Sequence, residues 1–159
     1  MVNSGAPDSL ALDGTGRRFG IVAARFHGAI VDRLLAGAEA ALRTHGVAPA
    51  DIRVVRVPGA WEIPAGLDAL ARSGEYSALV ALGVLIRGGT MHFEVIADQC
   101  SRGIAEVALR RELPVTFGVL TCETMEQAEA RAGGAEGNKG EEAALAALEM
   151  ASLVARLRT

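Results

Sequence analysis

Residues 78–86 read ALVALGVLI, and residues 87–92, which follow them, read RGGTMH. The first run is apolar throughout, which is typical of a strand whose two faces are both buried in a parallel sheet. The second run contains a Gly-Gly-Thr turn and leads into a helical pattern over residues 92–110. A strand buried on both faces needs helices on both sides, so this stretch predicts an α/β architecture.

Strand-like and helix-like segments alternate on both sides of this stretch. Short apolar or β-branched runs predict strands at 19–23, 52–57 and 115–120. Apolar residues at helical spacing predict helices at 30–45, 63–71, 124–132 and 141–157. The helix over 124–132 opens with a capping-box pattern, Thr-Met-Glu-Gln, and Gly133–Gly137 breaks it. This order predicts a three-layer αβα sandwich with a mostly parallel four-stranded sheet of flavodoxin-like topology.

The first 16 residues differ from the rest of the chain. They are rich in Gly, Ser, Asp and Pro and lack periodicity, so we expect a flexible N-terminal arm over 1–16 and a single domain over 17–159. They hold no basic stretch followed by an apolar core, so no secretory signal is expected and the predicted location is cytoplasmic. The longest apolar run is far too short to span a bilayer.

Composition excludes several function classes. The 159 residues include 16 basic and 19 acidic side chains, for a formal net charge of −3, and only 4% aromatics. We therefore expect no binding of nucleic acid or of an anionic membrane. The two cysteines, Cys100 and Cys122, match no metal-binding spacing and predict two reduced thiols. Lys139 is the single lysine, so an enzyme-bound Schiff base would have to use it.

The turn after the central strand is a candidate anion site, because parallel sheets bind ligands outside the carboxyl ends of their strands. Gly88 and Gly89 let the backbone approach a ligand, Thr90 adds a hydroxyl, and the helix that follows presents free N–H groups. Phosphate is the anion that this pattern favours, although an ordinary turn explains the glycines equally well. The sequence matches neither the P-loop nor the dinucleotide-binding pattern, which favours a small metabolite over ATP or NAD.

His92 lies one helical turn or less beyond this turn, where it could move protons next to a phosphate ester. A lone histidine is more often a surface or capping residue, and that alternative stays open. His27 lies on the same sheet edge, and His45 lies at a helix end, where it stabilises the helix dipole. The HFE run at 92–94 matches half of a zinc deaminase signature, but the isolated cysteines do not complete it, so no metal is expected.

Other residues carry a functional and a structural interpretation. Phe26 and Trp61 follow two different strands and could stack on a planar ring, while a core or interface position is at least as good an interpretation for Trp61. Glu62 could bind a ligand or cap the helix beginning there. Arg131 could pair with phosphate, although a solvated helix face is the stronger interpretation in isolation. Phe117 falls inside a predicted strand, where a core position is the default.

Several blocks of the chain carry a family resemblance, and they occur in the family's order. The blocks are ARF at 24–26, VPGAWEIP at 57–64, ALGVLIRGGTMHFE at 81–94, FGVLT at 117–121, EQA at 126–128, RAG at 131–133 and GNKG at 137–140. The chain resembles the lumazine synthases, which catalyse the penultimate step of riboflavin biosynthesis. The Ile-Arg-Gly-x-Thr-x-His stretch is specific to them, and the resemblance covers about residues 19–153, so residues 17–159 are expected to form one lumazine-synthase-like domain.

The resemblance implies a transferase reaction. The 5-amino group of 5-amino-6-(D-ribitylamino)uracil condenses with the ketone of 3,4-dihydroxy-2-butanone 4-phosphate. Phosphate leaves and the ring closes with loss of water, which gives 6,7-dimethyl-8-ribityllumazine. The imine lies between the two substrates and not on the enzyme, which agrees with a chain that has one lysine. Catalysis would rest on positioning and proton transfer, with no metal and no organic cofactor.

The resemblance also implies roles for residues. The uracil and ribityl chain would be bound by Phe26, Ala60, Trp61, Glu62, Val84, Leu85 and Ile86, and by Phe117 from the neighbouring subunit. The phosphate would be held by Gly89, Thr90, Arg131 and Lys139. His92 would be the proton carrier. For Trp61, Arg131 and Phe117 these roles replace the structural interpretations given above.

The family resemblance also implies how the subunits assemble. In the family, active sites lie between adjacent subunits of a pentamer, and some members assemble twelve pentamers into a sixty-subunit icosahedral shell. The short Gly133–Lys139 turn resembles that of shell-forming members, and riboflavin synthase is the partner that such an assembly implies. The alternative function is a shell-forming or ligand-binding relative with little turnover. A flavodoxin-like regulatory module carries little weight, because the acidic cluster and flavin loops are missing.

Overall fold

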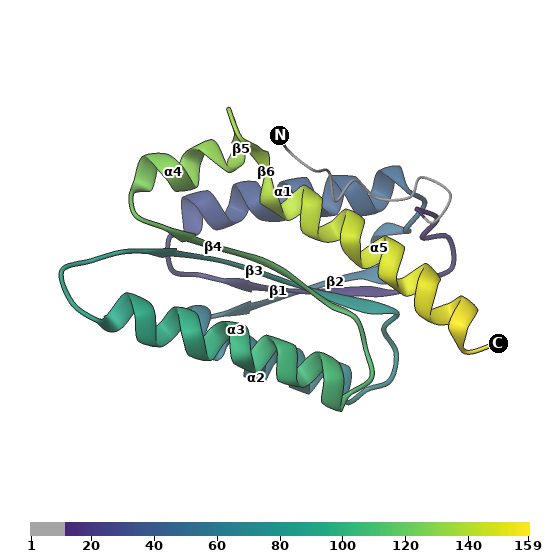
Figure 1. The fold of residues 1–159 in the computed structure, drawn as a ribbon. Coiled ribbons are helices and arrows are strands. Elements are labelled where there is room, and N and C mark those ends of the chain that lie inside the picture. Colours follow the sequence, from purple (N-terminus) through teal and green to yellow (C-terminus); the bar gives the residue numbers. More distant parts are fainter. Residues whose placement is uncertain (1–11) are drawn as a thin grey trace.

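The computed structural model describes residues 12–159. The strands that form its main sheet are β1 (Phe19–Ala24), β2 (Ile52–Val57), β3 (Ala78–Ile86) and β4 (Val115–Cys122). All neighbouring strands pair in parallel, in the order β2-β1-β3-β4 (Figure 1). This confirms the predicted α/β sandwich with a four-stranded parallel sheet and flavodoxin-like topology.

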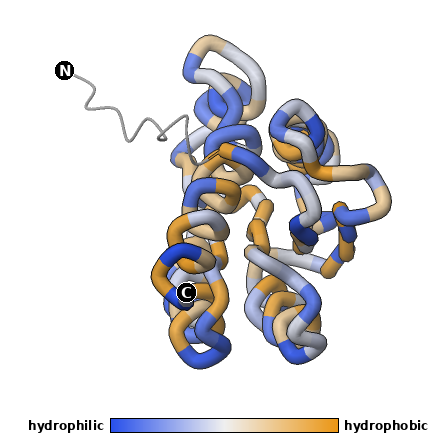
Figure 2. The backbone as a smooth tube through the Cα atoms, turned by 90° about the vertical axis from the view of Figure 1, so that its right-hand side faces the viewer, coloured by the Kyte–Doolittle hydropathy of each residue, from blue (hydrophilic) through white to orange (hydrophobic). Residues whose placement is uncertain are grey.

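Helices cover both faces of the sheet (Figure 1). One face packs against α1 (Gly28–Thr44) and α5 (Lys139–Leu157), and the other against α2 (Ile63–Ala71) and α3 (His92–Arg110). Each interface has its own buried apolar cluster, with Leu34 and Leu148 in the first and Leu67 and Ile104 in the second. Along the helices, hydrophobic and hydrophilic residues alternate, as expected for helices with one buried side (Figure 2). Within residues 12–159, no helix combines the length and apolarity needed to cross a membrane.

The central strand β3 is buried along most of its length, as its sequence predicts. Residues 78–84 are buried, and only Leu85 and Ile86 at its carboxyl end are half-buried. This gradient follows from the layers, because the helices cover the middle of the sheet and leave the strand ends open. The carboxyl end of β3 is therefore the place where a ligand can reach the sheet.

The segment after β4 differs from the prediction. The predicted helix over 124–132 ends at Ala130 as α4 (Met125–Ala130), and a small antiparallel hairpin follows, formed by β5 (Ala132–Gly134) and β6 (Gly137–Asn138). Gly133 and Gly137 have φ angles of 95° and 83°. These left-handed conformations suit glycine and end the helix early. The predicted helix end was thus two residues too late, and the glycine-rich break is a hairpin.

The start of α4 follows half of the predicted capping box. The Thr124 hydroxyl accepts a hydrogen bond from Gln127 N at 3.2 Å. The Gln127 side-chain oxygen accepts from Glu123 N at 2.8 Å, one residue before the position that a capping box uses. Glu123 is thereby tied to the first turn of α4.

Residues 1–11 of the predicted arm lie outside the described residues. Of the rest, Gly14 N donates to His45 O at 2.7 Å, and Leu12 packs against the α1–α5 cluster. His45 is the C-cap of α1, and its Nδ1 lies 2.8 Å from Ala41 O, which fits the helix-end position expected for it. The division between arm and domain at residue 16 stays a prediction.

Candidate active site

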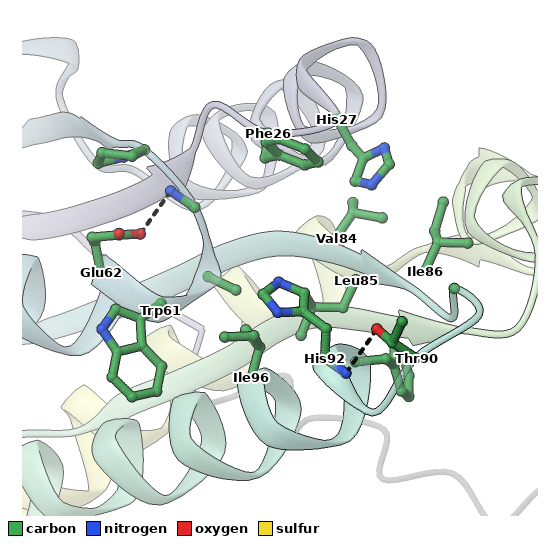
Figure 3. Close-up of a pocket in the computed structure, with 15 residues that line it drawn as sticks. Phe26, His27, Trp61, Glu62, Val84, Leu85, Ile86, Thr90, His92 and Ile96 are labelled. Atoms are coloured by element: carbon green, nitrogen blue, oxygen red, sulfur yellow. Dashed lines mark hydrogen bonds between the residues drawn. The ribbon is translucent and has the colours of Figure 1, made fainter.

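A cleft lies at the carboxyl ends of the strands, at the predicted edge of the sheet. Its volume is about 620 Å³, which suits a metabolite of moderate size. Five stretches line it: the loop after β1, the loop after β2 with the short helix η3 (Ala60–Glu62), the end of β3, the turn that follows β3, and the first turns of α3 (Figure 3). Of the predicted site residues, it brings together Phe26, Ala60, Trp61, Glu62, Val84, Leu85, Ile86, Thr90 and His92.

The loop after β1 is held by hydrogen bonds that continue the sheet. Arg25 N donates to Val57 O at 2.8 Å, and Phe26 N donates to Pro58 O at 3.0 Å. The Phe26 ring remains 70% exposed and meets the His27 ring edge-on at 5.1 Å between centroids. A large apolar ring held this far into solvent is available to stack on a flat ligand.

His27 has a left-handed backbone with φ 56°, a conformation that a non-glycine residue adopts at a cost. It is the N-cap of α1 and also lines the cleft. From the sequence, His27 was expected on the ligand-binding edge of the sheet, but no role was assigned to it. Its strained backbone turns the chain from β1 into α1 directly beside Phe26.

The loop after β2 presents Trp61 to the cleft. The Trp61 side chain is 55% exposed, so the core interpretation left open by the sequence is wrong. One carboxylate oxygen of Glu62 accepts from Gly59 N at 3.0 Å, across the turn of η3. Glu62 is the N-cap residue of α2, but its side chain makes no capping hydrogen bond to that helix, so the predicted capping role is wrong for α2 and the carboxylate caps η3 instead. Its role toward a ligand stays a prediction.

The predicted anion turn lies at the rim of the cleft, between β3 and α3. Gly88 and Thr90 line the cleft, whereas Gly89 does not. The Thr90 hydroxyl oxygen accepts from His92 N at 3.3 Å, which leaves the hydroxyl proton available to a bound anion. Because α3 runs for 19 residues, its N-terminus also offers the N–H groups and partial positive charge that anions favour.

His92 is the first residue of α3 and lines the cleft. Figure 3 shows its ring pointing from the start of the helix into the cleft, away from Thr90. Ile96 lies one turn further along α3 and adds an apolar wall. A proton carrier in this position would lie between the anion turn and the exposed aromatic rings.

Besides Gly89, three predicted site residues do not line the cleft of their own chain: Phe117, Arg131 and Lys139. Phe117 lies on the edge strand β4 and is 43% exposed, so its default core interpretation is wrong. Arg131 is the C-cap of α4, and its Nη1 donates to Gln127 O at 3.0 Å. The hairpin brings Lys139 next to it, with Lys139 N donating to Arg131 O at 2.8 Å.

Both thiols are buried, and neither is suited to act as a nucleophile. Burial raises the pKa of Cys100 to about 11. Burial also raises the pKa of Cys122, against a smaller opposing effect of the Arg131 guanidinium. A raised pKa keeps a thiol protonated near neutral pH. The effect of Arg131 on Cys122 also shows that this guanidinium lies near the carboxyl end of β4.

Four cleft residues were assigned no site role from the sequence, namely Pro58, Gly59, Phe93 and Ile96, although Pro58 and Gly59 lie in the segment directly after a predicted strand, where a ligand was expected. Ile96 had a usable signal, because positions i and i+4 share one face of a helix and His92 was already a candidate. Phe93 had no such signal. Among residues 12–159, no group of three or more His, Cys, Asp or Glu side chains is placed to hold a metal ion.

Comparison with known proteins covers nearly the whole chain. The sequence model of the family described as 6,7-dimethyl-8-ribityllumazine synthase matches residues 16–155. A relative of that name from Aquifex aeolicus (strain VF5) is 53% identical over 147 residues, which are 92% of this chain and 96% of the relative. Another, from Anaeromyxobacter sp. (strain Fw109-5), is 51% identical over 144 residues, with 91% and 88% covered.

Proposed function

Since the chain belongs to the 6,7-dimethyl-8-ribityllumazine synthase family, we propose that the cleft described above is the active site in which its two substrates meet. The activity is that of lumazine synthase, a transferase of riboflavin biosynthesis. It condenses 5-amino-6-(D-ribitylamino)uracil with 3,4-dihydroxy-2-butanone 4-phosphate to give 6,7-dimethyl-8-ribityllumazine, phosphate and two molecules of water. The observation that carries this function is the family match over residues 16–155, which includes every loop that lines the cleft.

In the proposed arrangement, Phe26 stacks on the pyrimidine ring, which the exposure of its own ring supports. The ribityl chain and ring edge lie along Ala60–Glu62 and the end of β3, where Val84, Leu85 and Ile86 line the cleft. The phosphate of the second substrate lies at Gly89 and Thr90, against the N-terminus of α3.

The proposed chemistry needs positioning and proton transfer. The uracil 5-amino group attacks the ketone carbon, and the resulting carbinolamine loses water to form an imine between the substrates. Phosphate leaves by elimination, and ring closure with loss of a second water gives the product. His92 would deliver a proton to the departing hydroxyl and take one back, because it lies between the anion turn and the aromatic rings. Holding the two substrates together supplies the rest.

We further propose that the site is completed by a neighbouring subunit in a pentamer. Within residues 12–159, no Lys or Arg side chain lines the cleft, although one substrate carries a phosphate. Phe117 is exposed on the edge strand, and Arg131 and Lys139 lie together on the hairpin side, away from the cleft of their own chain. A second copy could bring such side chains to the cleft. The sixty-subunit icosahedral shell, association with riboflavin synthase and a cytoplasmic location belong to the same proposal, with the short 133–139 hairpin supporting the shell.

The activity is tested by mixing the purified protein with both substrates and following lumazine formation by absorbance and fluorescence. Formation well above the uncatalysed rate is expected. A folded, oligomeric protein that gives only the background rate would contradict the activity. It would favour the shell-forming or ligand-binding alternative instead.

The shared site is tested by mixing two inactive variants, Phe117→Ala and His92→Ala, under conditions that exchange subunits. If Phe117 acts on the neighbour's His92, some sites in mixed oligomers contain both native residues, at most about a quarter in an equal mixture. Activity is then expected to return after mixing. If both residues serve a site within one chain, every site in the mixture stays defective and no activity returns.

A further inference from the structure

Arg87 joins three segments at the base of the anion turn. It is the first residue after β3, and its backbone N donates to Cys122 O at 2.9 Å. Its Nε donates to both carboxylate oxygens of Glu123, at 3.0 and 2.8 Å. Its Nη1 donates to Glu94, in the first turn of α3, and its guanidinium lies over the Phe93 ring at 4.6 Å. The end of β3, the start of α3 and the segment after β4 are therefore held by one side chain.

The turn that Arg87 spans has little packing of its own. Residues 87–90 are all exposed, and a Cβ added at Gly88 or Gly89 would meet nothing within 4 Å. The position of the turn is therefore set by its two ends. Arg87 lies before it and contacts Phe93 and Glu94 directly after it, which fixes the distance between those ends.

The same side chain also reaches toward the second group of predicted phosphate ligands. Glu123, its partner, donates its backbone N to the Gln127 side chain at 2.8 Å. The backbone carbonyl of Gln127 in turn accepts from Arg131 Nη1 at 3.0 Å. Hydrogen bonds, each at a different atom of the shared residue, thus link Arg87 to Glu123, Glu123 to Gln127 and Gln127 to Arg131.

We propose that Arg87 is a positioning residue for phosphate binding: it holds the Gly88–Thr90 turn of its own cleft, and through Glu123 it holds the α4 segment whose Arg131 would serve the cleft of the neighbouring subunit. This inference rests on the proposed function, since it concerns the substrate that carries the phosphate. Arg87 is not itself the phosphate ligand. It does not line the cleft, and two carboxylates, those of Glu94 and Glu123, surround its single positive charge.

The expected consequence of losing Arg87 concerns binding more than folding. The three side chains of this ion cluster are each more than a third exposed, and pairs so exposed contribute little to stability. Phosphate binding is more sensitive, because helix N–H groups and a hydroxyl bind an anion only in the correct geometry. A displacement of the turn by a fraction of an ångström is therefore expected to weaken it. The uracil ring, which would lie against other loops, is expected to bind almost as before.

Steady-state kinetics with each substrate varied in turn test the proposal. Arg87→Ala is expected to raise the KM for the butanone phosphate about tenfold and the KM for the uracil less than about twofold. Arg87→Lys, which keeps the charge but loses the planar fork, is expected to recover only part of this loss. The matched control is Arg102→Ala, because Arg102 forms a similar exposed ion pair with Asp98 on the same helix, and both KM values should stay unchanged. Equal changes in both KM values for Arg87→Ala, or none, would overturn the proposal.

The variant Glu123→Gln distinguishes a positioning role of Arg87 from direct contact between Arg87 and the phosphate. If Arg87 acts through Glu123, this variant weakens binding of the phosphate substrate in the same direction as Arg87→Ala, and the double variant is little worse than Arg87→Ala alone. If Arg87 itself bound the phosphate, removing the competing carboxylate would leave binding unchanged or make it tighter. That result would overturn the positioning role.

Calorimetric titration with inorganic phosphate gives a readout that does not depend on turnover. The dissociation constant is expected to rise about tenfold in Arg87→Ala and to stay unchanged in Arg102→Ala. Should the unmodified protein bind phosphate with this pattern but catalyse no lumazine formation, the proposed function fails and the positioning role stands. Should it catalyse the reaction while Arg87→Ala binds phosphate equally well, or should it bind no phosphate, the positioning role fails.

Discussion

Arg131 is proposed to bind phosphate, although within a single chain it does not line the cleft. It caps α4, donates to Gln127 O and lies near the buried Cys122 thiol, outside the cleft. If it holds the phosphate, Arg131→Ala should raise the KM for the butanone phosphate by about tenfold or more and the KM for the uracil much less. Kinetics with each substrate varied separately measure this. Arg43→Ala, at the far end of α1, is the control and should change neither value.

An equal rise in both KM values for Arg131→Ala would remove the phosphate assignment. The variant would then be acting on the structure of the site as a whole. A loss confined to kcat would point to a role in the departure of phosphate.

At the residue scale, the sequence and physical principles predicted where the cleft lies but not all of the residues that form the site. The aromatic residues after two strands, the glycine turn and His92 could be chosen because strand ends of a parallel sheet share one edge. The roles of Phe117 and Lys139 came only from the family resemblance, and for Arg131 only the resemblance favoured the phosphate role over a solvated helix face. Sequence periodicity indicates which residues share a face within one chain. These three side chains do not line the cleft of their own chain, so periodicity could not assign them to it.

Among the elements, the crossing of α1 and α5 leaves no room for a side chain at Gly140. A Cβ there would overlap the Leu34 carbonyl, which is backbone and cannot rotate away. Gly140→Ala should therefore lower the free energy of unfolding by about 1–3 kcal/mol, through forced separation of the two helices. Urea or thermal unfolding at one fixed protein concentration measures the change.

The matched control for Gly140→Ala is Gly28→Ala, in the first turn of α1. A Cβ at Gly28 meets nothing within 4 Å, so this variant should be as stable as the parent or more stable by about 0.4–1 kcal/mol. If both variants lose similar stability, the cost at Gly140 does not come from the helix crossing.

The elements that the sequence predicted best are those with the strongest patterns. The continuous apolar run gave β3 its correct bounds, and helical periodicity gave α2 and α3 theirs. The region after α4 was predicted worst, since a glycine-rich stretch carries no side-chain pattern. Gly133 and Gly137 permit a hairpin through their backbone angles, and nothing in their neighbours' side chains indicates it.

At the scale of the whole molecule, α2 and α3 are joined by one carboxylate. Asp68 accepts from Arg111 Nε at 2.8 Å and from Arg110 Nη2 at 2.9 Å. Hydrogen bonds from Arg111 and Arg110 hold the pKa of the Asp68 carboxyl well below its usual range. A lowered pKa means that the unfolded chain binds the proton more tightly, so this contribution to stability is fully present above about pH 4 and is lost as the pH falls further.

Asp68→Asn should therefore lower stability at pH 7, by an amount on the order of 1 kcal/mol, and the difference from the parent should shrink below about pH 4. Thermal unfolding of both proteins from pH 7 to pH 2 measures this dependence. Asp98→Asn, which removes the exposed Asp98–Arg102 pair, should change little at any pH. A difference for Asp68→Asn that stays constant down to the lowest pH would contradict the assignment.

Trp61 is the only tryptophan of the chain, and it lies in the wall of the cleft with more than half of its side chain exposed. The intrinsic emission of the protein therefore comes almost entirely from one indole at the place where substrates are proposed to bind. A ligand that covers this ring would change its emission, with no signal from a buried tryptophan to dilute the change. The same exposure makes tryptophan emission a poor reporter of unfolding, because the indole is already largely in contact with water in the folded chain.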